Sequence, residues 1–206
     1  MCNLYRMRKA TDEIAGLFRA SAEPAANLGE EVYPGYPGLV VAEHRIEAMT
    51  WGFPLAQTGK RGQAIKPKPI NQARGDKLGT AFWRSSFQTR RCLVPFSAWA
   101  EPEGDKGAMT RTWCSLEQED PFAVAGIWRP TVEWGKAFAV VMVDRPEPIV
   151  ANHGRVPLIL AREDWALWAG GDADAALGLC RPDTHRLVID RTDAPWNAGR
   201  IAVSRS

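Results

Sequence analysis

Apolar and polar residues alternate along most of the chain in short runs, each bounded by glycine, proline or charged residues. Period-two alternation and short apolar runs of this kind are typical of β-strands. The segments predicted as strands are LVVAEH (39–44), IEAMTWGFP (46–54), RRCLVPFSAWA (90–100), TRTWCSL (110–116), FAVAGIW (122–128), AFAVVMV (137–143), VPLILA (156–161) and HRLVID (185–190).

Helical periodicity is confined to a few short segments. In residues 11–20, Thr11 is a candidate N-cap, and the apolar residues that follow share one face. Residues 162–170 and 172–180 carry acids near their starts, which favours helices, and residues 80–87 predict one or two helical turns. Many strands with few helices indicate an α+β class built on a mostly antiparallel sheet or barrel-like core.

Length and composition favour one globular domain over residues 1–206. The chain is 45% hydrophobic and 24% charged, as in ordinary globular proteins. It has no alternating βαβ rhythm and neither a GxGxxG nor a GKS/T phosphate loop. It also lacks an apolar run of the roughly 18 residues that a membrane helix needs, and a signal-peptide layout at its start. We therefore expect a cytoplasmic protein without a membrane partner.

Four cysteines are widely spread, at positions 2, 92, 114 and 180. None forms a CxxC pair, so the spacing indicates neither a metal site nor a secreted disulfide framework. We expect Cys92, Cys114 and Cys180 to be buried, reduced and to pack as small hydrophobic residues. No metal or cofactor is expected.

Cys2 is different because it follows the initiator methionine directly. Removal of Met1 would give Cys2 a free α-amine beside its thiol, and both groups have a reactive fraction at neutral pH. The amine can form a Schiff base with an aldehyde, and the thiol can then close onto the imine as a five-membered thiazolidine. The alternative is a trivial start, since chain ends are usually mobile.

A basic stretch and an excess of tryptophan bear on nucleic-acid binding. The net charge is only +2, but residues 57–77 carry Lys60, Arg61, Lys66, Lys68, Arg74 and Lys77 among glycine and proline breakers. We predict a long loop here, either functional or simply solvated. Most of the nine tryptophans should be core residues, and a few exposed ones could stack on unpaired bases.

Two residues are the best candidates for proton transfer. Glu101 follows a β-run and has Trp99 nearby, and an aromatic wall can raise a carboxyl pKa towards neutrality. Glu103 is an equally near competitor. His153 lies in a loop between two apolar strands, which suits a general acid or base, although a surface or turn histidine fits as well.

Arg74 lies in the segment INQARGDK with two amide side chains before it. Its guanidinium suits a phosphate, and Asn71 and Gln72 could donate to a sugar or base. The alternative for Arg74 is a surface salt bridge with Asp76.

Taken together, these pieces resemble the SRAP family of SOS-response-associated peptidases or abasic-site processing proteins. The matching stretches run from one end of the chain to the other. They are MC, TWGFP, INQARGD, RRCLVPFSAWAEPEG, FAVAGIW and NHGRVPLIL.

The resemblance implies an SRAP-like fold and a specific chemistry. Members lose Met1, and the exposed cysteine traps the ring-opened aldehyde of an abasic site in single-stranded DNA as a thiazolidine cross-link. By this resemblance Cys2 is the nucleophile, Glu101 the catalytic glutamate, His153 the histidine of the H-x-R-x-P motif, and Arg74 the phosphate contact of the NAR motif. The implied partner is single-stranded DNA with abasic sites. We further expect a monomer that associates with the nucleoid when it is bound to DNA.

The chain departs from the family pattern at three points. The family commonly begins Met-Cys-Gly-Arg, whereas here the first arginine is Arg6. Two residues before Arg74 stands Gln72 where the family has asparagine, so either Asn71 or Gln72 takes that place. Pro102 stands where the motif usually has tryptophan.

The last predictions concern the residues that contact DNA and two alternative functions of the protein. We expect Trp51 and the basic segment 57–77 to contact the DNA, with a core position as the alternative for Trp51. A cysteine-dependent peptidase that acts on other proteins and a non-covalent single-strand-binding module are the competing functions. The first would need an internal Cys–His pair.

Overall fold

A five-stranded β-barrel forms the centre of the structure, which is a computed structural model that describes residues 2–22, 28–150 and 154–198. The barrel strands pair in the order β13, β12, β9, β4 and β5, and β5 returns to β13 through parallel pairs such as Phe138 with Trp51. Their bounds are β4 Pro37–Ala42, β5 Arg45–Trp51, β9 Arg91–Phe96, β12 Phe122–Thr131 and β13 Gly135–Asp144. Because the pairing closes on itself, these strands leave no open edge.

Short strands extend the barrel at its margins. β2 (Ser21–Ala22) lies parallel to β5, and β8 (Gln72–Arg74) lies parallel to β13. β14 (Arg155–Pro157) and β15 (Ile159–Leu160) pair antiparallel with β13 and β12. Most of the strand pairs are antiparallel, as the sequence predicts.

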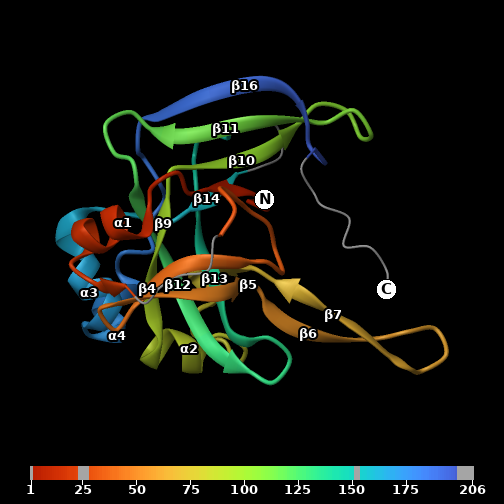
Figure 1. The fold of residues 1–206 in the computed structure, drawn as a ribbon, viewed down its shortest axis with the longest axis horizontal. Coiled ribbons are helices and arrows are strands. Elements are labelled where there is room, and N and C mark those ends of the chain that lie inside the picture. Colours follow the sequence, from red (N-terminus) through yellow and green to blue (C-terminus); the bar gives the residue numbers. More distant parts are fainter. Residues whose placement is uncertain (1, 23–27, 151–153, 199–206) are drawn as a thin grey trace.

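A second sheet lies over the barrel and contains the start of the chain (Figure 1). Its strand order is β16, β11, β10, β1 and β3. The bounds are β1 Tyr5–Arg6, β3 Glu31–Val32, β10 Ala98–Glu103, β11 Thr110–Leu116 and β16 Leu187–Pro195. β10 follows β9 after the single residue Ser97, so one continuous segment joins the barrel to this sheet.

Short helices cover the barrel. α1 (Thr11–Phe18), α3 (Trp165–Gly170) and α4 (Ala173–Leu177) gather at one end, and α2 (Arg84–Thr89) lies below (Figure 1). The 3₁₀ turns η1 (Gly75–Lys77) and η2 (Arg162–Asp164) precede α2 and α3. The N-cap of α1 is Ala10 rather than the predicted Thr11; the Glu13 carboxylate accepts a hydrogen bond from the Ala10 N–H at 3.1 Å.

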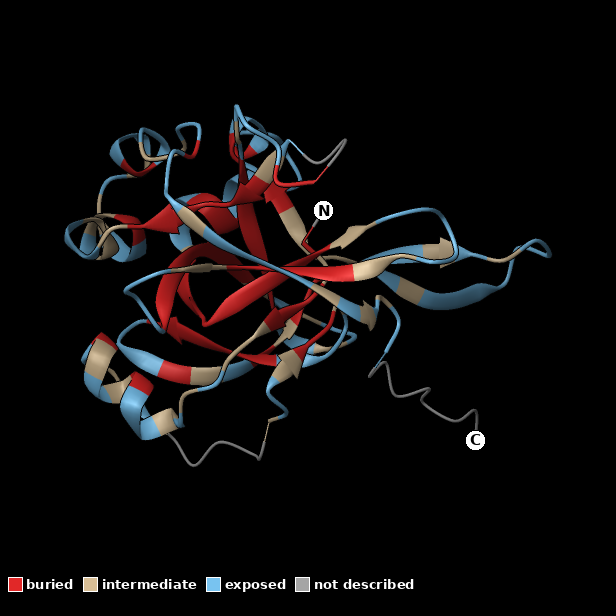
Figure 2. Cartoon of the chain, turned by 90° about the horizontal axis from the view of Figure 1, so that it is seen from above, coloured by how far each residue is buried: buried red, intermediate tan, exposed pale blue. Residues whose placement is uncertain are grey.

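A projecting β-hairpin, followed by β8 and η1, replaces the long loop predicted for residues 57–77. β6 (Phe53–Thr58) pairs with β7 (Ala64–Ile70), and the ribbon extends away from the barrel with mostly exposed residues (Figures 1 and 2). The prediction was wrong because a ribbon with water on both faces needs no apolar alternation. The chain turns into the hairpin at Gly52, whose φ of +121° and close approach to Pro69 leave no room for a Cβ.

The buried residues form one main core inside the barrel and under the helices (Figure 2). The predicted strands are confirmed, with three of them divided: 46–54 at Gly52, 90–100 at Ser97 and 156–161 at Leu158. The fold class is therefore confirmed as α+β on a barrel-like, mostly antiparallel core. Among the described residues, no helix is long and apolar enough to cross a membrane.

Candidate active site around Cys2

The N-terminal segment is fixed in the middle of a sheet. Tyr5 of β1 lies opposite Trp99 of β10 on one side and Val32 of β3 on the other. The Ala100 N–H donates a hydrogen bond to the Leu4 carbonyl at 2.9 Å, which extends the pairing towards the terminus. Cys2 itself is fully buried. A residue so near a chain end would ordinarily be mobile, so its place here is a product of the fold.

Two side-chain amides hold the backbone of Cys2. Asn71 Nδ2 donates to the Cys2 carbonyl at 3.2 Å and to Asn3 Oδ1 at 3.1 Å. Gln72 Nε2 donates to the same carbonyl at 2.5 Å. The sequence left open whether Asn71 or Gln72 takes the family's asparagine position. In the structure both side-chain amides hold the Cys2 carbonyl. They contact the chain's own terminus in the structure, whereas the sequence predicted a contact with DNA.

The Asn71 backbone is itself anchored to the barrel. Its carbonyl accepts hydrogen bonds from the Val140 N–H and from Trp51 Nε1, each at 3.0 Å. Gln72 begins β8 and lies opposite Val140 of β13. The amides that orient Cys2 are thus attached to two barrel strands, which makes them a rigid support.

Glu101 is the carboxyl group of this site. It lies on β10, is 1% exposed, and is close enough to Cys2 and Cys114 to act on both thiols. Burial raises the pKa of the Cys2 thiol well above its usual value, and the Glu101 charge raises it further. Burial and Glu101 likewise raise the pKa of Cys114 to about 12. Both thiols are therefore protonated at neutral pH.

Glu103, the competing carboxyl, has a different environment on the same strand. It accepts hydrogen bonds from the Thr112 hydroxyl and from Arg191 Nε, the latter at 3.0 Å. The Thr112 hydrogen bond and the Arg191 charge hold the pKa of Glu103 below its ordinary value. Glu103 thus belongs to a partly exposed pair between β10 and β16, and the structure favours Glu101 as the carboxyl group beside Cys2.

Two predicted DNA contacts have partners inside the protein. Arg74 forms a two-pronged salt bridge with Asp76, with N–O distances of 2.8 and 2.6 Å, and its side chain is about half exposed. The salt bridge with Asp76 that the sequence offered as the alternative is therefore present, and the exposed guanidinium remains accessible to a phosphate.

Trp51 is fully buried between Tyr5 and Phe138. The predicted stacking of Trp51 on a base is wrong in this conformation because neither ring face reaches solvent.

Two further residues singled out in the sequence are His153 and Arg6, and the structure describes only Arg6. His153 lies outside the described residues. Arg6, the displaced early arginine, stacks 3.6 Å from the Trp113 ring centroid and pairs with Glu31 at 3.0 Å. Glu31 also pairs with Arg111 at 3.0 Å. Arg6 is thus part of a salt-bridge network that joins β1, β3 and β11.

Sequence reasoning missed two neighbours of Cys2. Cys114 interacts electrostatically with Cys2 and Glu101, although the sequence suggested only a small core residue. The buried Tyr5 stacks on Phe96 at 4.1 Å and, like Cys114, lies close enough to the Cys2 thiol to interact with it. No local signal could have found Cys114, because only the pairing of Trp99 with both Tyr5 and Cys114 brings these segments together.

Of the other two cysteines, Cys92 is buried as predicted, whereas Cys180 is only partly buried. Cys92 is fully buried, and burial raises the pKa of its thiol. Cys180 is partly buried, and burial raises its pKa to about 11. All four cysteines are free thiols. In the described part of the chain, no group of His, Cys, Asp and Glu side chains is arranged to hold a metal ion.

Comparisons with known proteins agree with this architecture. The profile of the family described as SOS response associated peptidase (SRAP) matches residues 1–191. No functionally curated protein matches the chain in sequence. Crystal structures of proteins from Bordetella bronchiseptica and Bacteroides thetaiotaomicron share the fold, with TM-scores of 0.76 and 0.74 at 20% and 16% identity. The first alignment covers 93% of this chain and 99% of that one, and the second covers 92% and 91%.

A phage-related protein from Bordetella bronchiseptica is also similar. Its TM-score is 0.69 at 19% identity, over 93% of this chain and 94% of that chain. At these identities the three structures establish the fold alone.

Proposed function

We propose, from the premise that the chain belongs to the SRAP family, that it traps abasic sites in single-stranded DNA covalently through Cys2. The family places the protein in the SOS response to DNA damage. The trap itself, its product and its substrate are our proposal. In it, Cys2 becomes the first residue when Met1 is removed, and the cross-link shields the lesion.

The observation that carries the proposal is the anchoring of Cys2. The second residue of the chain is fully buried, held by two side-chain amides, and placed beside a buried carboxyl group. Ordering a chain end costs conformational entropy, and a trivial N-terminus would remain mobile. A reactive terminus, in contrast, must be held in one geometry relative to its acid–base partner.

The chemistry balances without a cofactor. Hydrolysis of the Met1–Cys2 peptide bond frees the Cys2 amine. The amine nitrogen adds to the aldehyde carbon of the ring-opened sugar and one water molecule leaves, which gives an imine. The Cys2 sulfur then adds to the imine carbon, and the thiol proton passes to the nitrogen. The product is a five-membered ring that contains the aldehyde carbon and four atoms of Cys2. The hydrolysis consumes one water molecule and releases methionine, and imine formation returns one water molecule.

Glu101 is the proposed proton-transfer group. The Cys2 thiol is kept protonated by burial, so it needs a base at the moment when sulfur attacks. Glu101 is the carboxyl group that acts on this thiol. His153 is proposed as the second proton-transfer residue from its place in the H-x-R-x-P motif, here His153-Gly154-Arg155-Val156-Pro157. Asn71 and Gln72 are proposed as positioning residues, because they hold the Cys2 carbonyl.

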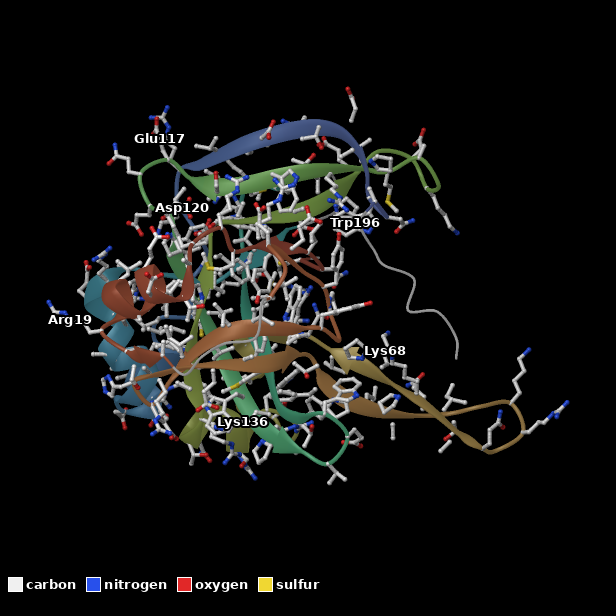
Figure 3. The ribbon with its side chains drawn as sticks, in the orientation of Figure 1. Arg19, Lys68, Glu117, Asp120, Lys136 and Trp196 are labelled. Carbon is white, nitrogen blue, oxygen red and sulfur yellow. The ribbon has the colours of Figure 1, made fainter. Side chains whose placement is uncertain are left out.

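Recognition of the DNA would depend on phosphates and flanking bases, since an abasic site has no base to read. The β6–β7 hairpin presents Lys60, Arg61, Lys66 and Lys68, and Figure 3 shows Lys68 near its base. Arg74 follows the amides that hold Cys2 and is proposed as a phosphate contact close to the reactive centre. We propose a monomer as the active form.

A cysteine peptidase that acts on other proteins is less well supported. Its nucleophile would need an adjacent histidine. Of the histidines in the described residues, His185 forms a hydrogen bond with Asp183 at 2.6 Å, and His44 lies in the β4–β5 turn. Neither is among the groups that act on the Cys2 thiol. Cleavage at the chain's own Met1–Cys2 bond suits this terminus better.

The proposal is tested with an oligonucleotide that contains one abasic site. Untagged protein should give a shifted band on a denaturing gel, and Cys2→Ala should give none while it retains weak, salt-sensitive binding. Cys180→Ala is the matched control and should cross-link normally, because Cys180 packs beside Gly75 and is not among the groups that act on the Cys2 thiol. Wild-type adduct yield from Cys2→Ala would refute the proposal. Cleavage of unrelated peptides would support a peptidase, and a shift on native gels alone would support a non-covalent module.

A further inference from the structure

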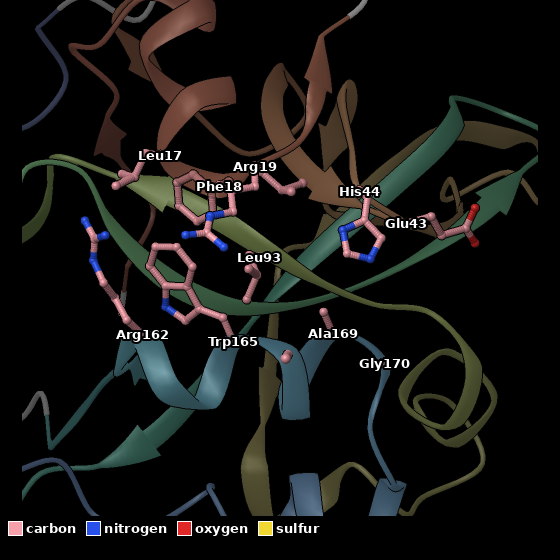
Figure 4. Close-up of a pocket in the computed structure, with 12 residues that line it drawn as sticks. Leu17, Phe18, Arg19, Glu43, His44, Leu93, Arg162, Trp165, Ala169 and Gly170 are labelled. Atoms are coloured by element: carbon pink, nitrogen blue, oxygen red, sulfur yellow. The ribbon is translucent and has the colours of Figure 1, made fainter.

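A concave site lies at the helical end of the molecule, away from the residues around Cys2. It is a groove of about 630 Å³ between the end of α1, the β4–β5 turn and α3 (Figure 4). None of its lining residues belongs to the Cys2 site. The groove is within the size range of ligand-binding clefts, and the proposed DNA chemistry does not use it.

The floor of the groove is apolar and aromatic. Phe18 and Trp165 stack at 4.4 Å with an interplanar angle of 10°, which joins α1 to α3. Leu17, Val41 and Leu93 add aliphatic surface from α1 and from the barrel strands β4 and β9. Such a floor is suited to a bulky apolar side chain.

The rim carries an excess of positive charge. Arg19 and Arg162 stand on opposite walls, with His44 and one acid, Glu43, at the turn. Within the described residues, neither arginine has a carboxylate at salt-bridge distance, and Arg162 instead lies 5.4 Å over the Trp165 ring. Both guanidinium groups therefore remain available to an anion.

The backbone of the rim is unusual. Across the described residues, the non-glycine residues with positive φ are Arg19 at 49°, Glu43 at 51° and His44 at 59°. All three line this groove. Arg19 is the left-handed C-cap of α1, and Glu43 and His44 form the β4–β5 turn, so this backbone places all three side chains at the edge of the groove.

We propose that this groove binds an acidic peptide segment of a partner protein, with one bulky apolar side chain of the peptide on the Phe18–Trp165 floor. The carboxylates on either side of that anchor would pair with Arg19 and Arg162. This combination of aromatic floor and flanking guanidinium groups matches the usual anchors of peptide-binding hot spots.

Two other occupants match the groove less well. A nucleic-acid strand would need a continuous row of cations rather than two arginines around an apolar floor. The chain's own last residues, GRIAVSRS (199–206), contain two arginines and neither Asp nor Glu, so their side chains do not complement the rim.

The test uses fluorescence anisotropy with a labelled Ser-Asp-Glu-Leu-Phe-Asp-Glu-Gly peptide, which has acids on both sides of its apolar anchor, and the full-length protein. We expect saturable binding that weakens with salt, and loss of binding when Leu-Phe is replaced by Ala-Ala or the acids by lysine. Arg19→Glu with Arg162→Glu should weaken binding by about tenfold or more, since two attractions become repulsions. Both arginines are exposed, so thermal unfolding and yield of the abasic-site cross-link should match wild type.

A charge-matched control separates a local site from net charge. Arg84 and Arg186 are exposed and lie outside the groove, so Arg84→Glu with Arg186→Glu should bind the peptide as wild type does. Equal weakening by both double variants, or no binding at all, would overturn the proposal. Displacement of the peptide by oligo-dT, with the Arg19/Arg162 variant losing DNA affinity equally, would assign the groove to DNA instead. Self-association that this variant abolishes, without peptide binding, would assign it to a second copy.

Discussion

The Cys2 site and the β6–β7 hairpin differ in how firmly the rest of the molecule holds them. Cys2 precedes β1, which pairs with β10 and β3, and the amides of Asn71 and Gln72 at the start of β8 hold its carbonyl. The hairpin is a two-stranded ribbon, with Lys66 and the apolar Ile65 exposed on β7 and Lys60 and Arg61 exposed at its tip. A small displacement of Cys2 would change the reaction geometry, whereas long-range attraction to phosphates tolerates a moving ribbon.

Because of this difference, we expect substitutions at the Cys2 site and in the β6–β7 hairpin to change different measured quantities. Changes around Cys2 should alter the rate of cross-linking with little change in affinity for DNA. Changes in the hairpin should alter affinity and its salt dependence with little change in rate at saturating DNA. Each prediction below tests that division, from the largest expected effect to the smallest.

The largest effect is expected from a blocked N-terminus. An uncleaved extension before Cys2 turns its α-amine into an amide, which is not basic and cannot form an imine. Such a protein should bind abasic single-stranded DNA but give no stable cross-link on a denaturing gel. A C-terminal tag is the control and should be harmless. If intact-mass measurement shows that Met1 is fully retained in protein that cross-links at the normal rate, thiazolidine chemistry at Cys2 is excluded.

Glu101→Gln should have the next largest effect. It removes the proposed proton-transfer group but keeps the side-chain shape, and loss of a general acid or base slows a reaction by about 10²–10⁴-fold. Single-turnover cross-linking followed over time measures the rate. Glu103→Gln is the matched control, with the same chemical change two residues along β10, and should react almost normally. The opposite pattern would show that the carboxyl group has been misassigned.

The double change Asn71→Ala with Gln72→Ala should slow cross-linking by about 10²-fold, the cost of a small misplacement of a reacting group. Binding to undamaged single-stranded DNA should hardly change, because both amides bond the Cys2 carbonyl. Gln88→Ala, on the exposed face of α2, is the control. A large loss of affinity with an unchanged rate would instead show that the two amides contact DNA, as the sequence suggested.

Lys66→Ala with Lys68→Ala should have the smallest effect on chemistry. Each lost phosphate contact should lower the slope of log affinity against log salt by about 0.7 for a single strand. Titrations at several salt concentrations measure this slope. Lys106→Ala with Arg186→Ala removes the same charge from exposed positions outside the hairpin and should leave the slope unchanged. An equal change in both double variants would mean that only net charge matters.

Several features were predictable from short stretches of sequence because they depend on local pattern. Alternating apolar residues located the barrel strands, and the acids and apolar face located α1. The order of short motifs indicated the family, and with it the choice of Cys2 and Glu101 as site residues. Their proposed roles in the reaction still rest on the experiments above, as does the role of His153, which lies outside the described residues.

Other features depend on contacts that no local pattern records. Trp51 gives the same strand signal whether its ring faces solvent or the core, and closure of the barrel through β5 and β13 decided that it is buried. The hairpin has no apolar alternation because water surrounds it. The hydrogen bonds from Asn71 and Gln72 to Cys2 join residues about 70 positions apart. The sequence by itself thus determined the strands, the first helix and the reactive residue types, because these follow from local periodicity and chemistry. Only the tertiary structure decided which side chains surround Cys2, because strand pairing between distant segments sets those distances.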